Sequence, residues 1–157
     1  RCERELWVAG DPAHPALRQA RAPGGARPRR QVGADLGERM HHALGTALAR
    51  APRAVLVGSD CPALDAAYIE EAFTALATAD LVLGPALDGG YVLIGARRLD
   101  RRLFDGVPWG TGEVLAQTLA RAAALHWEVA LLAPLRDIDR PEDLAAWGRA
   151  PNAFSAG

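Results

Sequence analysis

The chain contains no lysine, and this absence removes several kinds of chemistry from consideration. All 18 basic residues among the 157 are arginine. No lysine is therefore available within this sequence as a Schiff base, a phosphate clamp or a general base. A GC-rich genome is a sufficient cause of the arginine bias, so we infer no arginine-specific role from it.

Cysteines and long apolar runs are also scarce. The two cysteines, Cys2 and Cys61, are too few for a disulfide framework and fit a reducing compartment, so we predict a cytoplasmic protein. No apolar run approaches the roughly 18 residues that span a bilayer, and nothing resembles a signal peptide. The chain opens at Arg1 rather than Met, almost directly on a predicted strand, and we expect it to be truncated at its N-terminus.

Charge is unevenly distributed along the chain. Residues 1–53 carry ten arginines against five acidic residues, and the remainder has an acidic excess. A basic region can attract a phosphorylated ligand or, in principle, a nucleic acid. The excess comes largely from residues 18–30, which are rich in proline and glycine and lack aromatic side chains, as is typical of a solvated loop. We therefore predict no nucleic-acid partner.

Strands and helices are predicted to alternate along most of the chain. Residues 10–34, with four prolines and four glycines, are interpreted as a long loop. The alternation predicts one α/β domain over residues 1–157, with a mainly parallel sheet and helices on both faces. The hairpin-like segment 81–95 breaks the alternation and makes the sheet mixed. Strands are predicted at 6–9, 54–58, 81–85, 91–95 and 127–132. Helices are predicted at 36–50, at 66–79 with Asp65 as the N-cap, at 112–125 and from about Pro141.

Acidic residues follow two of the predicted strands. Asp60 comes after the apolar run 54–57, and Asp137 and Asp139 follow the run 129–132. The carboxyl ends of strands in an open α/β sheet are where ligands bind, and two such ends would form an oxygen-rich site for a hard divalent cation. Asp60 before Cys-Pro equally suits a turn cap, and the run from Asp137 also resembles a helix start. Asp137 and Asp139 lie two residues apart and face the same side of an extended chain, which favours the metal site.

Three further motifs are candidates for ligand contacts. Asp88 precedes Gly89, Gly90 and Tyr91, where paired glycines permit a sharp turn and a close approach to a ligand, although Asp-Gly also marks a simple hairpin. Residues 33–40 place glycines and an acid at a predicted helix N-terminus, where free N–H groups can bind an anion and where Asp35 also suits an N-cap. Trp109 and Thr111 could form a wall and a hydroxyl contact for an acceptor, and Trp109 could equally be core or rim packing.

Two other chemistries are rejected. Cys61 lacks the histidine and asparagine arrangement of a cysteine nucleophile. His41 and His42 are adjacent on a predicted helix, so their side chains diverge and do not ligate one metal together. The chain also has no zinc-ligand spacing and no Walker loop.

Five motifs occur in order along the chain: GADLGERM from Gly33, LVGSDCPAL from Leu56, LGPALDGGYVLIG from Leu83, LFDGVPWGT from Leu103 and DIDRPEDL from Asp137. Together they resemble a bacterial family, the one labelled selenodomain-associated or arsenosugar-biosynthesis glycosyltransferase-like. The resemblance spans about residues 5–147. It implies a GT-A-like nucleotide-diphospho-sugar transferase fold, akin to phospholactate guanylyltransferases and molybdenum-cofactor nucleotidyltransferases.

The resemblance also implies an activity and a set of partners. The activity is transfer of a glycosyl group from a nucleotide-diphosphate sugar with Mg²⁺ or Mn²⁺. The alternatives are nucleotidyl transfer, which releases pyrophosphate instead of a nucleoside diphosphate, and a non-catalytic nucleotide-binding remnant. The implied partners are the nucleotide substrate and a small-molecule acceptor. As separate expectations, we predict association with a second copy of the chain and no membrane span.

Site residues are carried over from the resemblance by motif position. Asp60 is implied in catalysis and metal binding, with Asp139 and then Asp137 completing the metal site. The family normally begins with a strand and a Pro-Gly loop ending in Lys-Thr-Arg around the nucleotide phosphates, and this chain has no such segment. The nucleotide side is implied to include Asp35, Leu36, Gly37 and Arg39, and the acceptor side Asp88 as a catalytic residue with Gly89, Gly90, Tyr91, Trp109 and Thr111.

Overall fold

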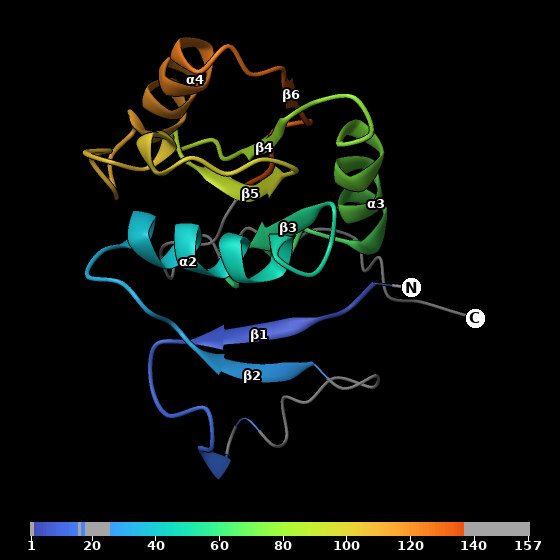
Figure 1. The fold of residues 1–157 in the computed structure, drawn as a ribbon, viewed down its shortest axis with the longest axis vertical. Helices are drawn as coiled ribbons and strands as arrows, with labels where there is room; N and C mark the ends of the chain where they lie inside the picture. Colours follow the sequence, from blue (N-terminus) through green and yellow to red (C-terminus); the bar gives the residue numbers. More distant parts are fainter. Residues whose placement is uncertain (1, 16, 18–25, 137–157) are drawn as a thin grey trace.

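The computed structural model describes residues 2–15, 17 and 26–136, and Figure 1 shows how their elements are arranged. Among them, α2 and β3 lie between the pair β1–β2 and the remaining strands (Figure 1). In chain order the elements are β1 (Glu5–Val8), β2 (Arg27–Arg30), α2 (Leu36–Leu48), β3 (Ala54–Val57), α3 (Ala66–Ala75), β4 (Leu81–Pro85), β5 (Tyr91–Ala96), the 3₁₀ helix η1 (Arg101–Leu103), α4 (Val114–Ala124) and β6 (Val129–Leu131).

The strands form two sheets. β1 and β2 pair in parallel, and a four-stranded sheet has the order β3-β5-β4-β6. β5 is antiparallel to both of its neighbours, whereas β6 is parallel to β4. β3, β4 and β6 therefore run in one direction and β5 in the other. The α/β class and the mixed sheet are confirmed, but these pairings do not confirm the predicted dominance of parallel strands.

Two clusters of buried side chains attach the helices to the four-stranded sheet. β4 contributes Leu81 and Leu83 to the first cluster and Val82 to the second. Successive side chains of a strand point to opposite faces, so the clusters lie on opposite sides of β4. The helical members of the first cluster include Met40 and Leu44 of α2 and Ala122 of α4, and those of the second include Tyr68 and Ala72 of α3.

The predicted N-caps are confirmed at two helices. The Asp35 carboxylate accepts a hydrogen bond of 2.8 Å from the Glu38 amide at the start of α2. The Asp65 carboxylate accepts one of 2.9 Å from the Tyr68 amide at the start of α3. Each cap satisfies a backbone donor that has no partner within the helix, so both helix starts are determined by local sequence.

One predicted loop is wrong in part. Residues 27–30 form β2 within the segment 10–34, although Pro28 lies in that strand. Pro28 is opposite Leu6 in the pairing with β1, and a proline is tolerated because β2 is an edge strand. The pairing partner is about twenty residues away in sequence, so no local pattern indicates this strand. The helix predicted near Pro141 lies outside the described residues.

Within the part of the chain that the structure describes, no helix has the length and apolar character that crossing a bilayer requires.

Candidate functional site

The candidate site lies where β3, β4 and β6 end and β5 begins. The Gly58 amide, just after β3, donates a 2.9 Å hydrogen bond to the Val92 carbonyl at the start of β5. Beyond β4, the Ala86 amide bonds the Gly90 carbonyl at 3.0 Å, and the Leu135 amide bonds the Pro85 carbonyl at 2.9 Å. The carboxyl ends of three strands thus lie at the same end of the sheet. In open α/β sheets, ligands bind at this end.

Asp60 is exposed at this carboxyl end of the sheet. Its Oδ1 accepts a hydrogen bond of 2.9 Å from the hydroxyl of neighbouring Ser59. No ion-pair partner for Asp60 occurs among the described residues. The carboxylate therefore keeps acceptor capacity for a ligand, because one oxygen and one lone pair of the other are unused by that contact.

The segment that leads to the C-terminal acidic run passes close to Asp60. The thiol of Cys61 donates a hydrogen bond of 3.5 Å to the carbonyl of Arg136. Asp137 and Asp139, the other predicted metal ligands, lie outside the described residues. Within the described residues, no group of three or more His, Cys, Asp or Glu side chains is placed to hold a metal ion.

Asp88 organises the turn between β4 and β5. Its Oδ1 accepts a hydrogen bond of 2.8 Å from the Gly90 amide. Gly89 has φ +92°, and a Cβ added there would collide with the backbone of Gly112. The turn therefore has a defined conformation, which a local hydrogen bond and close packing against the segment before α4 stabilise. Asp88 itself remains exposed.

Tyr91 points into the protein from the first position of β5. Its ring packs against the first core cluster. Burial raises the pKa of the Tyr91 hydroxyl above its ordinary value of 10.0. Gly89 and Gly90 thus form the surface of the turn, while Tyr91 anchors it from inside.

The N-terminus of α2 is tightly closed by its own residues. Besides the Asp35 cap, the Glu38 carboxylate accepts a 2.8 Å hydrogen bond from the Ala34 amide, and Arg39 Nε donates to the Gly33 carbonyl at 3.2 Å. Asp35 and Arg39, predicted as nucleotide contacts, therefore shape the turn that begins the helix. Leu36, the first residue of α2, is exposed to solvent over 49% of its surface.

Trp109 joins the predicted nucleotide side to the predicted acceptor side. A Cβ at Gly37 would lie 2.6 to 2.9 Å from three indole atoms, so the glycine permits the ring to lie against α2. The indole Nε1 is buried and has no hydrogen-bond partner within the described residues. Thr111 donates to the Pro108 carbonyl at 2.8 Å and so stabilises the loop that carries Trp109. Gly112 of the same loop meets Gly89, so one loop touches both helix and turn.

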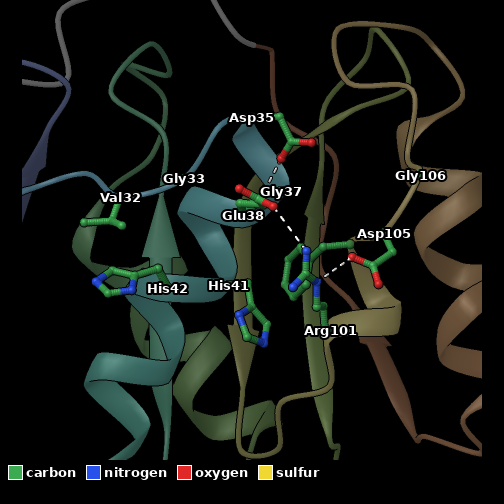
Figure 2. Close-up of a pocket in the computed structure, with 11 residues that line it drawn as sticks. Val32, Gly33, Asp35, Gly37, Glu38, His41, His42, Arg101, Asp105 and Gly106 are labelled. Atoms are coloured by element: carbon green, nitrogen blue, oxygen red, sulfur yellow. Dashed lines mark hydrogen bonds and ion pairs between the residues drawn. The ribbon is translucent and has the colours of Figure 1, made fainter.

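A groove of about 380 Å³ runs beside the first turns of α2 (Figure 2). Asp35 and Gly37, both predicted site residues, line it, but its opposite wall was not predicted. That wall is formed by Arg101 of η1 and by residues 104–106 after it. Residues 104–106 belong to the motif LFDGVPWGT, which begins at Leu103. His41 and His42 diverge as predicted, His41 against Phe104 and His42 against Trp7. The full lining is Val32, Gly33, Asp35, Gly37, Glu38, His41, His42, Arg101, Phe104, Asp105 and Gly106.

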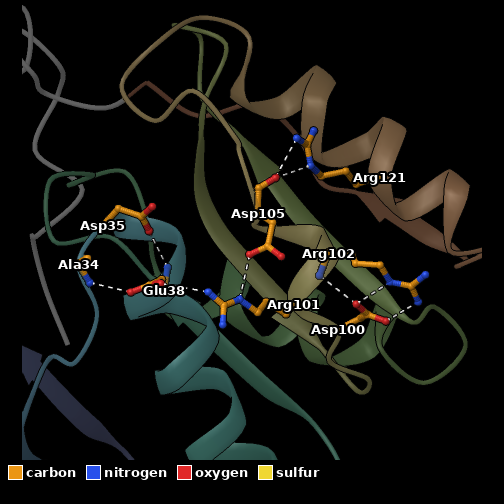
Figure 3. Close-up of polar contacts among 8 residues, drawn as sticks. All are labelled: Ala34, Asp35, Glu38, Asp100, Arg101, Arg102, Asp105 and Arg121. Atoms are coloured by element: carbon orange, nitrogen blue, oxygen red, sulfur yellow. Dashed lines mark hydrogen bonds and ion pairs between the residues drawn. The ribbon is translucent and has the colours of Figure 1, made fainter.

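Arg101 spans the groove and connects its walls. Its guanidinium contacts Glu38 of α2 at 3.2 Å and Asp105 at 3.0 Å, as Figure 3 shows. The Asp105 carbonyl in turn accepts hydrogen bonds of 2.9 and 3.2 Å from Arg121 of α4. No local sequence pattern indicates this network, because its members are 63 and 16 residues apart. Only the Arg101–Asp105 spacing of four residues hints at a pair.

The neighbouring Asp100 is a half-buried carboxylate with a strong local partner. Hydrogen bonds from the side chain and the amide of Arg102 lower the pKa of Asp100 to about 2. The pair belongs to the start of η1, where Asp100 is the N-cap, and it faces away from Arg101 (Figure 3). We therefore interpret the ion pair between Asp100 and Arg102 as a structural contact at the protein surface.

Comparison with known proteins identifies a matching family and a similar solved structure. Residues 1–111 match a family described as "Uncharacterized protein conserved in bacteria (DUF2064)". A crystal structure from Desulfovibrio desulfuricans G20, described as a "putative nucleotide-diphospho-sugar transferase", is 34% identical to the chain with a TM-score of 0.84. The match covers 96% of this chain and 68% of that one. A comparison with curated proteins finds no match.

Proposed function

The chain belongs to the bacterial family DUF2064, and from this membership and its site we propose that it transfers a glycosyl group from a nucleotide-diphosphate sugar to a small-molecule acceptor. The observation that carries the proposal is the 34% identity, over 96% of the chain, to a structure described as a "putative nucleotide-diphospho-sugar transferase". The meeting of three carboxyl strand ends at one sheet edge supports it independently.

We propose within this activity that Asp60 contributes to a divalent metal site, with Asp139 and Asp137 as its partners. The donor set fits Mg²⁺ or Mn²⁺, because carboxylate oxygens are the ligands that these hard cations prefer. The exposed Asp60 carboxylate and the contact between Cys61 and Arg136 support this assignment, since the acidic run follows Arg136 directly in the sequence. When bound, such a cation supplies charge that offsets the diphosphate leaving group.

On the nucleotide side we propose that the start of α2 forms the surface against which the donor lies. Trp109, which the resemblance places on the acceptor side, contacts this surface at Gly37. The first N–H groups of a helix and its dipole favour an anion, and Gly37 lets the Trp109 ring lie against this first turn. The buried indole N–H of Trp109 is a donor without a protein partner among the described residues, which a polar substrate group would satisfy. Asp35 and Arg39 would act by keeping the turn closed.

On the acceptor side we propose that the turn at Asp88 holds the acceptor, with Gly89, Gly90 and Thr111 beside it. One oxygen of Asp88 already accepts the Gly90 amide, and the exposed carboxylate can accept a second hydrogen bond from an acceptor hydroxyl. A carboxylate in that position would orient the hydroxyl and accept its proton as the new bond forms. Tyr91 would support the turn from the core.

We propose that residues 1–157 belong to one domain, and that within the family the chain falls in the selenodomain-associated or arsenosugar-biosynthesis group. The order of the five motifs from Gly33 to the run after Arg136 supports this grouping.

The decisive experiment compares wild type with Asp60→Asn. Calorimetric titration with nucleoside-diphosphate sugars, with and without Mn²⁺, should show that Mn²⁺ strengthens binding in the wild type and that the variant loses most of this effect. We expect a loss of about tenfold or more, because a full carboxylate charge is removed from the cation's ligands. Glu70→Gln on the exposed face of α3 is the matched control for charge. Unchanged metal dependence in a folded Asp60→Asn protein would reduce Asp60 to a turn cap.

Product analysis separates glycosyl transfer from its rivals. Release of a nucleoside diphosphate together with a glycosylated acceptor supports the proposal. Release of pyrophosphate from a nucleoside triphosphate would indicate nucleotidyl transfer instead. Metal-dependent binding without either product would indicate a nucleotide-binding protein.

A further inference from the structure

We propose that Trp109 is a positioning residue that couples the donor surface at the start of α2 to the acceptor turn at Asp88. The inference rests on the proposed function, which places the nucleotide-diphosphate sugar at the first of these surfaces and the acceptor at the second. It goes beyond that function, because it states that occupancy of the first surface is transmitted to the second. The link is the loop of residues 107–113.

One end of the loop lies against α2. A Cβ added at Gly37 would be 2.6 Å from the Cζ2 atom and 2.8 Å from the Nε1 atom of the Trp109 indole. Real Cβ atoms do not tolerate such distances, so the ring occupies the space that a side chain at this position would need. Gly37 immediately precedes Glu38, whose amide the Asp35 cap binds. A ligand that fixes the first turn of α2 therefore also fixes the surface against which the indole lies.

The other end of the loop is bonded to the acceptor turn. The Leu115 amide, in the first turn of α4, donates a hydrogen bond of 2.9 Å to the Gly89 carbonyl. Glu113, the N-cap residue of α4, makes no side-chain cap hydrogen bond, so the turn supplies an acceptor that a capping side chain usually provides. A Cβ at Gly112 would lie 3.1 Å from the Asp88 carbonyl oxygen. Loop and turn are therefore in close backbone contact.

Hydrogen bonds within the loop limit how far its two ends can move independently. The Trp109 amide donates to the Val107 carbonyl at 2.9 Å, and the Thr111 hydroxyl donates to the Pro108 carbonyl at 2.8 Å. The same hydroxyl oxygen accepts a hydrogen bond of 3.3 Å from the Glu113 amide. Thr111 thus bonds to residues on both sides of it. A shift of the indole is therefore carried along the loop to the turn.

The Trp109 indole also has an unused hydrogen-bond donor. Its Nε1 is buried and has no acceptor within the described residues. A buried donor without an acceptor is costly, and a phenyl ring would pack against Gly37 without that cost, so the N–H indicates a role besides packing. A nucleotide-diphosphate sugar at the start of α2 carries phosphate and hydroxyl oxygens that can accept this hydrogen bond. Its binding should therefore fix the indole, and the indole should fix the loop.

Amide hydrogen exchange, measured residue by residue by NMR on the full chain, tests the coupling. The probes are UDP-glucose, GDP-mannose, ADP-glucose and dTDP-glucose, each at saturation and with Mn²⁺, so that any metal requirement is met whichever residues hold the ion. The Glu38 amide reports on the donor surface, and the Gly90 and Leu115 amides report on the turn. A bound probe should slow exchange at Glu38. It should also slow exchange at Gly90 and Leu115 by about fivefold or more, the lower end of couplings between sites.

Two variants should break the link while the donor surface stays occupied. Trp109→Phe keeps an aromatic ring and removes the N–H, and Gly37→Ala adds a methyl group where the ring now lies. In both, the bound probe should still slow exchange at Glu38, whereas the slowing at Gly90 and Leu115 should fall below about twofold. Trp109→Phe leaves α2 unaltered, so its result decides if Gly37→Ala fails to bind the probe.

Each variant has a matched control. Gly45→Ala adds the same methyl group to the same helix and meets only the end of the Leu99 side chain. Trp127→Phe makes the same change at an indole that packs against Arg98, which follows the end of β5 opposite to the turn. Both controls should keep the wild-type slowing at the turn.

The measured quantity is the ratio of exchange rates with and without probe in the same variant. A change in overall stability alters both rates and cancels in this ratio. A merely structural Trp109 would therefore speed exchange in Trp109→Phe with and without probe, and the ratio at Gly90 and Leu115 would keep its wild-type value.

The outcomes separate this inference from the proposed function. If no probe binds, or if a bound probe does not slow exchange at Glu38, the proposed donor surface and the coupling both fail. If a probe slows exchange at Glu38 but not at Gly90 and Leu115, or if Trp109→Phe keeps the wild-type ratio, the donor surface stands and the coupling alone is overturned. Slowing at the turn that Trp109→Phe loses and the controls keep supports the coupling.

Discussion

The two ends of the four-stranded sheet use the same residue type in opposite ways. At the amino end of β4, Asp80 is buried, with 5% of its surface exposed. It accepts hydrogen bonds of 3.2 Å from Arg97 and from the Glu128 amide, and Arg98 lies 3.6 Å away. At the carboxyl end, Asp60 and Asp88 are exposed and accept only local hydrogen bonds among the described residues. Aspartate at one end completes the fold, and at the other it leaves capacity for a ligand.

The difference lies in how the charge of each carboxylate is compensated. Burial by itself raises the pKa of Asp80, but the Glu128 amide, the Arg97 hydrogen bond and the charges of Arg97 and Arg98 outweigh it and hold the pKa below 3.8. A buried carboxylate must be paired in this way, because an unpaired charge away from water is costly. The exposed pair at the other end has no such requirement. We therefore expect substitutions at the two ends to separate stability from function.

The largest effect should come from Gly89→Val in the turn that carries Asp88. Its φ of +92° strains any β-branched residue, and the added Cβ would meet the Gly112 backbone. Strain and overpacking together should lower the free energy of unfolding by about 3 kcal/mol or more. Gly110→Val is the matched control, because Gly110 has φ +80° but nothing within 4 Å of its Cβ position.

Chemical denaturation of both glycine variants measures the difference. Gly110→Val should lower the free energy of unfolding only by the strain of a positive φ at a β-branched residue, about 1–2 kcal/mol. Equal losses in the two variants would show that contact with Gly112 is unimportant, and the functional end of the sheet would then be less rigid than the structure indicates.

The second largest effect on stability should come from Asp80→Ala, which removes the buried carboxylate. Its removal leaves the Glu128 amide without that acceptor, which should cost about 2 kcal/mol of unfolding free energy. The guanidinium groups of Arg97 and Arg98 add little, since their side chains are 39% and 58% exposed and water solvates them. Nucleotide affinity of the folded variant should be unchanged. A loss of affinity as large as that of Asp60→Asn would erase the distinction between the two ends.

The same variant should alter how stability depends on pH. Because the pKa of Asp80 is lower in the folded state, its contribution is fully present above the unfolded-state value of 3.8 and disappears as pH falls through the folded-state value. Thermal melts between about pH 5 and about pH 2 should therefore show a shallower acid-induced loss of stability in Asp80→Ala than in wild type.

The smallest effect on stability should be that of Asp88→Ala. It removes one hydrogen bond within an exposed turn, which should cost about 1 kcal/mol or less. Affinity for the nucleotide sugar should stay close to that of wild type, and the rate with acceptor should fall, because we place Asp88 on the acceptor side. A loss of nucleotide affinity equal to that of Asp60→Asn would move Asp88 to the donor side.

Sequence analysis was most successful where structure depends on neighbouring residues. The caps at Asp35 and Asp65, the turn at Asp88 and most strands were predicted from spacings of a few residues. It failed at residues 27–30, where Pro28 argues against a strand and only the pairing with β1 creates one. It named Gly37 and Trp109 separately, but had no means to predict that they touch.

Local sequence specified the starts of α2 and α3, the turn at Asp88 and the exposed carboxylates of Asp60 and Asp88 after their strands. These properties depend on backbone dihedral preferences and on hydrogen bonds over two to four residues. Tertiary structure alone decided which of those pieces meet: Trp109 with Gly37, Arg101 with Glu38, and Tyr68 with Ala133, 65 residues away. Such contacts follow from the packing of a shared core and from sheet register, which no local pattern encodes.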